Sequence, residues 1–534
     1  MMPTAVTLDS VGRIPFPGDN AAIASRRLDA GLEILAPTDS FRLSHGVLEG
    51  HRFAIVPIPK GQALLSWGLP FGVALQDIAP GDYVCNRKIL QALSQRHLDF
   101  PLPSTPNFAD HSIRYVLDEQ HFQPGTQVSR LSESPEFEGF ERGPRRGAGT
   151  RNYVVILGTS SRTASFARIL AERFPQTTAL FTNVDGVVPV AHTEGGDPSR
   201  PNNFEFVVRT LAGFMVHPNV GAVLAVDTGE EPVNNEVIQD FLKKHDYPIE
   251  SVPAEFMTLG SDFESCLQKG ESIVRKSLEQ ANRSSRSRMS VARLRFALQC
   301  GGSDAFSGVS GNPLAGWMAK RLIQFGGAAN LAESDELIGA EPYVLKNVKN
   351  LETARHFLGT LQRFQERASW HGHDAEGNPS GGNNYRGLYN IAIKSIGAAL
   401  KKDPEVCLDH VIDYGERMDS PGFYFMDSPG NDLESIAGQV AAGCNVILFT
   451  TGNGSITNFP FVPTLKIMTS TARFNLLSNE MDINAGRYQD GMSMDDLGAE
   501  AFDLALRVAA GQRTAGEHAG HSQVQIWREW RQTN

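Results

Sequence analysis

The stretch RLRFALQCGGSDAFSGVSGNPLAGWMAKRLIQF, residues 293–325, contains a strand, a glycine-rich turn and a helix in one continuous run. RLRFALQC predicts a buried strand, and Asn312 followed by Pro313 predicts the N-cap and first residue of a helix. The helix ends at Gly326 and carries an apolar stripe of Leu314, Trp317, Met318, Leu322 and Phe325. A buried strand followed by an amphipathic helix is the repeating unit of a parallel α/β sheet.

The same unit recurs upstream, where NYVVILG (152–158) precedes SFARILAERF (165–174), and VGAVLAVD (220–227) is another apolar strand. Short alternating stretches between Asp19 and Leu90 are separated by turn sequences, which is typical of a compact β-rich module. Residues 99–149 are rich in proline, glycine and acidic residues and predict an extended linker. We therefore predict a small β-rich domain over 1–98, a linker over 99–149, and α/β domains with largely parallel sheets over 150–288 and 289–534.

The composition indicates a globular protein and excludes several partners. The chain has 534 residues and a formal net charge of -11, which argues against nucleic acid because phosphate binding requires a basic face. No apolar run approaches the ~20 residues of a membrane-spanning helix, and the first residues lack a signal-peptide pattern. We expect a cytoplasmic protein without a membrane partner. Its 5 cysteines contain no CxxC pair, so neither a disulfide framework nor a zinc ribbon is predicted.

Three polar, glycine-rich segments follow apolar strands in the last predicted domain. They are CGGSDAFSG (300–308), NPSGGNNYRG (378–387) and TTGNGSITNFPFVPTLK (450–466). Loops at the carboxyl ends of parallel strands form ligand crevices, and glycines let backbone N–H groups approach an anion. The polar side chains of Ser303, Asp304, Asn383 and Thr451 can hydrogen-bond hydroxyl groups. The combination suits a polyhydroxylated carboxylate, and the alternative is that the three segments are only turns.

Six motifs occur in the order found in one known family. QCGGSDAFSGVSGNP, ESDELIGAE, NPSGGNNYRGL, FTTGNGS, VPTLK and MDINAG resemble signature stretches of galactarate and altronate dehydratases. The resemblance extends to GTRNYVVIL, HTEG and HPNVGAVL in the middle domain. The module around DNAAIA and GHRFA resembles the small β-clip, or SAF-like, domain at the N-terminus of family members. The resemblance therefore covers almost the whole chain.

The resemblance implies a hydro-lyase that dehydrates an acid sugar, such as galactarate or altronate, to a 2-keto-3-deoxy acid. The proton beside a carboxylate is weakly acidic, so the developing enediolate needs a metal or another positive group, and the family implies Fe²⁺, Mn²⁺ or Mg²⁺. Two alternatives stay open: a related lyase with another leaving group, as in sulfolactate sulfo-lyases, and a non-catalytic relative that binds an acid sugar. The expected partner is a small hydroxy acid, and a homodimer is compatible with the sequence.

Positions that match the family motifs supply the candidate residues. Catalysis is predicted for His192 in HTEG, Lys466 in VPTLK and Asp304, with Lys466 pairing with an anionic substrate or acting as the base. Substrate binding is predicted for Ser303, Asn312, Asn378, Gly382, Asn383, Thr451, Gly452 and Gly454. Glu333, Glu336, Cys300 and Asp482 are the predicted metal ligands, with a structural role as the alternative for each. His51 in GHRFA is predicted to reach the site from the N-terminal domain, and we expect the site to lie near the interface of the last two domains.

The chain also departs from the family in its cysteines and basic residues. Where typical members carry three middle-domain cysteines, this chain has Arg162, Gly196 and Gly229, and the cysteine that remains is Cys300. Asn384 and Asn453 stand where a lysine and an arginine are usual. Because an iron-sulfur cluster needs several converging thiolates, we expect no such cluster. A divalent ion held by carboxylates, histidine and substrate oxygens is expected instead.

Overall fold

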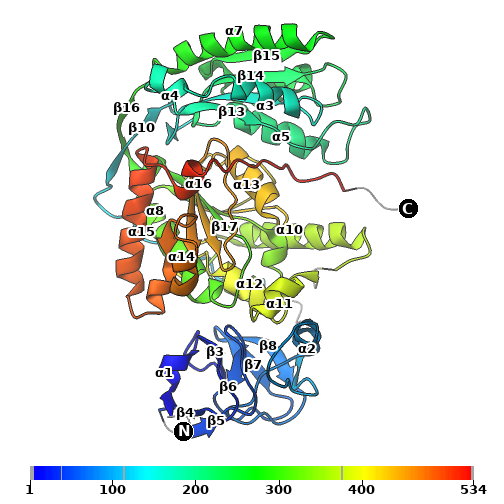
Figure 1. The fold of residues 1–534 in the computed structure, drawn as a ribbon, viewed down its shortest axis with the longest axis vertical. Helices are drawn as coiled ribbons and strands as arrows, with labels where there is room; N and C mark the ends of the chain where they lie inside the picture. The colour runs from blue at the N-terminus through cyan, green and yellow to red at the C-terminus, as the bar shows by residue number, and fades with distance from the viewer. Residues whose placement is uncertain (1–4, 38, 112–114, 375–376, 531–534) are drawn as a thin grey trace.

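Three domains are stacked along the long axis of the molecule (Figure 1). The structure is a computed structural model that describes residues 5–37, 39–111, 115–374 and 377–530. The N-terminal domain lies at one end, the last domain of the chain lies in the centre, and the middle domain lies at the other end. The predicted fold class is confirmed: a small N-terminal β domain precedes two α/β domains with parallel sheets. The described ranges contain no helix long and apolar enough to cross a membrane.

The N-terminal domain consists of three small three-stranded sheets around a core that includes Phe53, Phe71 and Phe108. The sheets have the orders β1-β4-β5, β2-β3-β6 and β7-β8-β9. β9 lies in the stretch predicted as a linker and pairs with β8. The elements are β1 Val6–Thr7, α1 Leu8–Val11, β2 Gly12–Arg13, β3 Ala21–Ala24, β4 Glu33–Leu35, β5 Ser40–Arg42, β6 Arg52–Ala54, β7 Ala63–Ser66, β8 Leu69–Ala74, α2 Arg87–Ser94 and β9 Phe108–Asp110.

The middle domain is built on a four-stranded parallel sheet of order β13-β12-β14-β15. Its central strands are fully buried because helices cover both faces. A separate antiparallel sheet of order β11-β10-β16 lies where the chain enters and leaves the domain. The elements are β10 Glu136–Glu141, β11 Ala148–Gly149, β12 Tyr153–Gly158, α3 Ala164–Glu172, α4 Thr177–Leu180, β13 Gly186–Val190, α5 Phe204–Met215, β14 Val220–Asp227, α6 Asn235–Lys244, β15 Ala254–Thr258, α7 Phe263–Ala281 and β16 Arg286–Ser290.

The C-terminal domain contains a seven-stranded parallel sheet of order β19-β20-β18-β17-β21-β22-β23. The strand order reverses at β17, whose neighbours β18 and β21 lie on opposite sides. The elements are β17 Arg295–Cys300, α8 Asn312–Gln324, β18 Ala328–Leu331, α9 Glu341–Val344, α10 Leu351–Ser369, α11 Gly381–Tyr385, α12 Ile391–Ala399, β19 His410–Ile412, β20 Gly422–Met426, α13 Asp432–Ala441, β21 Val446–Thr451, β22 Thr464–Met468, α14 Thr471–Leu476, β23 Ile483–Asn484, α15 Met494–Ala509 and α16 Ala515–His518.

The strand, turn and helix expected from residues 293–325 are present, with one difference at the start of the helix. A π-helical turn over Ser307–Gly311 precedes α8, and Gly311 occupies the N-cap position instead of Asn312. The Asn312 amide nitrogen donates to the Gly397 carbonyl oxygen at 2.8 Å, and its oxygen accepts from the Thr450 hydroxyl at 2.6 Å. Asn312 therefore joins α8 to α12 and β21, and it does not line the larger cavity described below.

The two α/β domains meet through helix packing and a buried ion pair. α5 of the middle domain packs on α13, so closely that a Cβ at Gly213 would lie 2.4 Å from the Ala441 carbonyl oxygen. Arg151, directly before β12, binds both carboxylate oxygens of Glu517 in α16, at 2.7 and 2.8 Å. The side chains are 1% and 8% exposed, so this pair is shielded from water. Although burial opposes ionisation, Arg151 lowers the pKa of Glu517.

Replacing one partner of this pair should destabilise the protein. Glu517→Gln leaves the Arg151 guanidinium buried without a counter-charge, which costs about 3–5 kcal/mol in comparable pairs. Urea unfolding should show this as a lower midpoint. The control Glu205→Gln removes an exposed partner of Arg200 and should change the free energy of unfolding by less than about 0.5 kcal/mol. Equal midpoints for the two variants would contradict the role given to the buried pair.

Candidate active site

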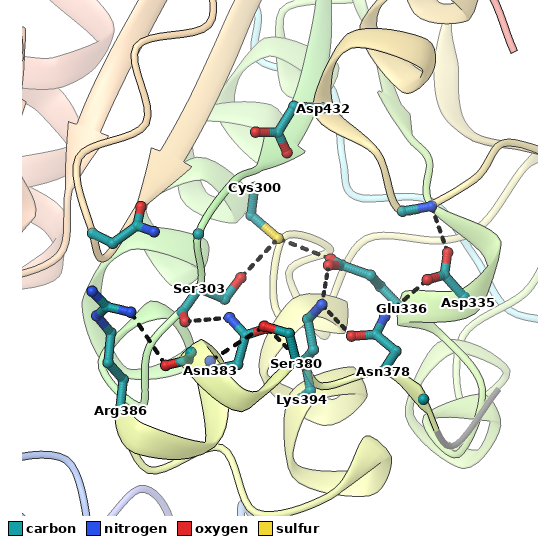
Figure 2. Close-up of a pocket in the computed structure, with 15 residues that line it drawn as sticks. Cys300, Ser303, Asp335, Glu336, Asn378, Ser380, Asn383, Arg386, Lys394 and Asp432 are labelled. Carbon is teal, nitrogen blue, oxygen red and sulfur yellow. Dashed lines mark hydrogen bonds and ion pairs between the residues drawn. The ribbon is translucent and has the colours of Figure 1, made fainter. Parts of the chain in front are cut away.

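A cavity of about 470 Å³ opens at the carboxyl ends of β17, β18, β20 and β21. This is where a parallel sheet forms a ligand crevice, because the strand order reverses at β17 and the following loops diverge. Figure 2 shows that its walls come from the turns after the strands and from α11 and α12. The lining residues are Cys300, Gly302, Ser303, Asp335, Glu336, Gly377, Asn378, Ser380, Gly382, Asn383, Arg386, Lys394, Gly430, Asp432 and Asn453.

Three potential metal ligands converge at one side of this cavity. Cys300 is the last residue of β17, and Glu333 and Glu336 follow β18. Their ligand atoms lie within 4.8 Å of one another, and all three side chains are buried. Glu333 has φ 74°, a left-handed conformation uncommon for a residue with a side chain. Its backbone N–H donates to the Ser428 hydroxyl at 2.9 Å, which holds the turn in this form.

Two buried lysines from α12 and its end neutralise these acids. Lys394 Nζ lies 2.9 Å from Glu336 Oε1. Lys401 Nζ lies 2.9 Å from Glu333 Oε2 and 3.0 Å from Cys300 Sγ. Burial opposes ionisation of Glu336, yet Lys394 and Lys401 lower its pKa to about 2. Burial and the charge of Glu336 raise the pKa of both Glu333 and the Cys300 thiol well above their usual ranges.

Sequence reasoning missed both lysines. They lie seven residues apart, about two helical turns, in the otherwise apolar run IAIKSIGAALKK. A pair of lysines on one face of an apolar helix is a signal for a buried anionic partner, because an unpaired ammonium is costly to bury. This spacing was available in the sequence.

Asp432 is a further carboxylate at the cavity that sequence reasoning did not select. It is the first residue of α13 and lies against the turn after β17, where a Cβ at Gly301 would be 2.4 Å from its Oδ2. Burial, followed by the negative charge of Glu336, raises the pKa of Asp432 to about 7. A carboxyl group with such a pKa can exchange a proton near neutral pH.

Several predicted substrate-binding residues line the cavity. Ser303 directs its hydroxyl toward Cys300 Sγ at 3.6 Å, and its carbonyl accepts from the Asn383 amide at 2.9 Å. The Asn378 amide donates to Asp335 at 2.8 Å and accepts from Lys394 at 2.5 Å. Gly382 lies in the first turn of α11. The loop that carries these residues is therefore fixed by hydrogen bonds to the acidic turn after β18.

The residues around Asp304 support the cavity from behind. Asp304 is buried, forms an ion pair with Arg473 at 3.2 Å and accepts from the Thr469 hydroxyl at 3.1 Å. A Cβ at Gly452 would lie 2.3 Å from the Asp304 carboxyl carbon, so this position accepts only glycine. The Thr451 hydroxyl accepts from the Gly454 N–H at 3.0 Å and closes the turn that holds Asn453 at the wall. None of these three predicted residues, Asp304, Thr451 and Gly454, lines the cavity.

His192 lies in the middle domain, and the structure does not bring it to Ser303, Asn383 and Gly452. It follows β13, and its Nε2 donates to the Gly158 carbonyl oxygen at 3.1 Å while Nδ1 accepts from the Glu194 N–H at 3.2 Å. Burial lowers its pKa to about 4. The cavity described above is lined by residues of the C-terminal domain alone and does not include His192, because each sheet has its own carboxyl edge. A site near the interface of the two α/β domains stays a prediction.

A smaller cavity of about 280 Å³ lies at the carboxyl edge of the middle-domain sheet. The positions that carry cysteines in typical family members meet beside it. Arg162 Nε donates to the Gly196 carbonyl oxygen at 2.8 Å, and Arg162 forms an ion pair with Glu230, the neighbour of Gly229, at 3.5 Å. In this chain the segment of the first of these positions is therefore joined to those of the other two by the Arg162 side chain.

Lys466, Asp482 and His51 also lie outside the cavity lining. Lys466 is fully buried on β22, and Asp482 accepts from the backbone N–H groups of Lys466 and Ala515, both at 2.8 Å. His51 accepts from the Tyr83 hydroxyl at 2.6 Å and donates to the Tyr385 carbonyl oxygen at 3.0 Å. It therefore reaches across from the N-terminal domain but ends on the backbone of α11. The metal role predicted for Asp482 has no support, since both its oxygens cap backbone groups.

Comparison with known proteins assigns all three domains to one family. Residues 15–92 match the altronate/galactarate dehydratase SAF domain, residues 139–282 the second domain of D-galactarate dehydratase/altronate hydrolase, and residues 291–532 the C-terminal domain of D-galactarate/altronate dehydratase. The first range contains the β-clip domain, the second contains most residues that line the smaller cavity, and the third contains all residues that line the larger cavity.

Individual relatives match over most of their length. An altronate dehydratase of Escherichia coli (strain K12) is 30% identical over 511 residues, 96% of this chain and 97% of that protein. A galactarate dehydratase (L-threo-forming) of the same strain is 26% identical over 95% of this chain and 93% of that protein. The (2R)-sulfolactate sulfo-lyase subunit beta of Chromohalobacter salexigens is 25% identical over 73% of this chain and 97% of that subunit. This protein belongs to the galactarate/altronate dehydratase family.

Proposed function

We propose that the protein is a sugar-acid hydro-lyase and that the larger cavity is its active site. The observation that carries the proposal is the convergence of Cys300, Glu333 and Glu336 on two buried ammonium groups beside a cavity, in a chain of this family. The relatives named altronate and galactarate dehydratase support a hydroxy-acid substrate. In the proposed reaction a C–H bond beside a carboxylate and a C–O bond on the next carbon break. The products are water and an enol that rearranges to a 2-keto-3-deoxy acid.

The three donor side chains fit a divalent ion. Two carboxyl groups and the Cys300 sulfur converge within 4.8 Å, and the set already attracts a buried cation, Lys401. Sulfur is a soft ligand, so the set favours Fe²⁺ or Mn²⁺ over Mg²⁺. When bound, such an ion supplies positive charge for the enediolate. Lys394, which lines the cavity, contributes positive charge from the protein itself.

Asp432 is the best-placed group for proton transfer. It lines the cavity, and among the described residues the two lysines form their ion pairs with Glu333 and Glu336, not with Asp432. The raised pKa near 7 makes the carboxylate a stronger base than an ordinary aspartate. We infer that Asp432 takes the proton beside the substrate carboxylate and returns it to the departing hydroxide. One molecule of water then leaves, and Asp432 is again ionised.

Turnover of a substrate panel tests the proposed function. Sugar acids and sulfolactate are incubated with enzyme that has been treated with chelator and supplied anaerobically with Fe²⁺, Mn²⁺ or Mg²⁺. We expect a 2-keto acid to form from at least one sugar acid and no sulfite to be released from sulfolactate. Sulfite release would favour the sulfo-lyase alternative, and binding without turnover of any acid would favour a non-catalytic protein.

The metal assignment is tested by binding, independently of turnover. Cys300→Ser should weaken Mn²⁺ binding, measured by calorimetry, by at least about 10-fold because a first ligand is lost. Cys266→Ser is the matched control, because Cys266 lies in α7 of the middle domain and accepts a hydrogen bond from the Gly260 N–H. Unchanged Mn²⁺ affinity in Cys300→Ser would show that the ion binds elsewhere or not at all.

The role of Asp432 is tested by its isosteric amide. Asp432→Asn should lower kcat by about 10²–10⁴-fold and abolish exchange of the substrate proton with D₂O, measured by NMR, because the amide cannot accept that proton. Glu434→Gln is the control: Glu434 lies on the same helix with its pKa also raised by burial to about 7, but it pairs with Arg528 at 3.2 Å. Proton exchange at the wild-type rate in Asp432→Asn would exclude Asp432 as the base.

A further inference from the structure

Arg386 is the basic side chain of the cavity wall that has no acidic partner. Its Nη1 donates to the Gly382 carbonyl oxygen at 3.2 Å, and within the described ranges no carboxylate lies within ion-pair distance of its guanidinium. The other cations near the cavity are neutralised: Lys394 by Glu336, and Arg473 by Asp304. Partial burial and the charge of Arg473 lower the pKa of Arg386, and the negative charge of Asp304, which lies beyond ion-pair distance, offsets this only in part.

Arg386 lies away from the acidic cluster. Figure 2 shows its guanidinium at one side of the cavity and Asp335 at the other, with Ser303 and Lys394 between them. The cavity therefore has two ends of different chemistry. One end holds the potential metal ligands with Lys394, and the other presents an unpaired guanidinium.

The backbone around Arg386 is held in place by contacts with the turn after β17 and with the N-terminal domain. The Arg386 carbonyl oxygen accepts from the Ala305 N–H at 3.1 Å, and His51 binds the carbonyl of the preceding residue, Tyr385. Gly387 has φ 85°, and a Cβ there would lie 2.0 Å from the Gly50 carbonyl oxygen. The guanidinium thus extends from a fixed backbone, which lowers the entropy lost when it binds a ligand.

We propose that Arg386 determines substrate specificity by binding a second carboxylate, so that the preferred substrate is a polyhydroxy dicarboxylic acid. This inference rests on the proposed function and adds to it. A guanidinium forms paired hydrogen bonds with a carboxylate, which a terminal hydroxymethyl group cannot replace. The reacting carboxylate then lies at the Lys394 end, and the second carboxylate lies at the Arg386 end. The cavity volume of about 470 Å³ is in the ordinary range for small-ligand sites.

The test compares wild type with Arg386→Gln on a matched pair of substrates, galactarate with two carboxylates and galactonate with one. Wild type should prefer galactarate. Arg386→Gln should lose about 10- to 100-fold in kcat/KM for galactarate, mainly through KM, and stay within about 3-fold for galactonate. Arg386→Lys should recover part of the loss. Arg96→Gln is the control, because Arg96 stacks 4.4 Å from the Tyr385 ring and does not line the cavity.

The possible outcomes separate this inference from the proposed function. Equal losses of kcat/KM on both acids in Arg386→Gln would show that Arg386 binds the reacting carboxylate. A wild-type preference for galactonate would also overturn the inference. In both cases the hydro-lyase proposal would stand. If wild type dehydrates neither of these acids nor any other sugar acid of the panel, the proposed function fails, and calorimetric binding decides the inference. The inference would be supported if wild type bound galactarate more tightly than galactonate and Arg386→Gln weakened the binding of galactarate. Equal affinity of wild type for both acids would overturn it.

Discussion

Lys401 lies in the protein interior with its ammonium 2.9 Å from Glu333 and 3.0 Å from the Cys300 sulfur. An isolated ammonium in this position would cost several kcal/mol, so lysine and acids have to be buried together. The requirement fixes three segments: the end of β17, the left-handed turn after β18 and the end of α12. These segments also form the cavity. The charged groups whose burial costs free energy on folding are therefore the same groups that are available for catalysis in the site.

The three domains contribute to this site unequally. The C-terminal domain supplies all the residues that line the larger cavity. The N-terminal domain contributes support: His51 and Gly50 contact the backbone of residues 385–387, beside the wall that holds Arg386. The middle domain packs on the opposite side through α5 and the Arg151–Glu517 pair, and it lines the smaller cavity together with Arg528 and Glu529 of the C-terminal segment. If the larger cavity is the active site, as proposed, the three-domain organisation places one domain on each side of a central catalytic domain.

The fold could be predicted further from the sequence than the site could. The strand, turn and helix of residues 293–325 follow from apolar periodicity, and Cys300 and Ser303 lie at the cavity because loops after parallel strands share one edge. Asn383 also lines the cavity, but its segment follows helix α10 and forms α11, so the expectation that it follows a strand was wrong. The sequence could not show which cavity His192 lies near, because the chain has two parallel sheets and each has such an edge. Lys466 lies inside β22, where its side chain is buried in the core, and not in the loop that precedes the strand. The spacing of Lys394 and Lys401 in a mostly apolar run was visible in the sequence, but their anionic partners come from other segments and could not be identified from it.

The location of the ion tests the account most directly. Crystals soaked anaerobically in Mn²⁺ should give an anomalous difference peak at bonding distance from Cys300 Sγ and from carboxylate oxygens of Glu333 and Glu336. Such a peak would place the cation at the proposed active site, with Lys401 beside it. A peak in the smaller cavity of the middle domain beside Thr193 and Glu194, with none at Cys300, would contradict the assignment of the reaction to the C-terminal domain.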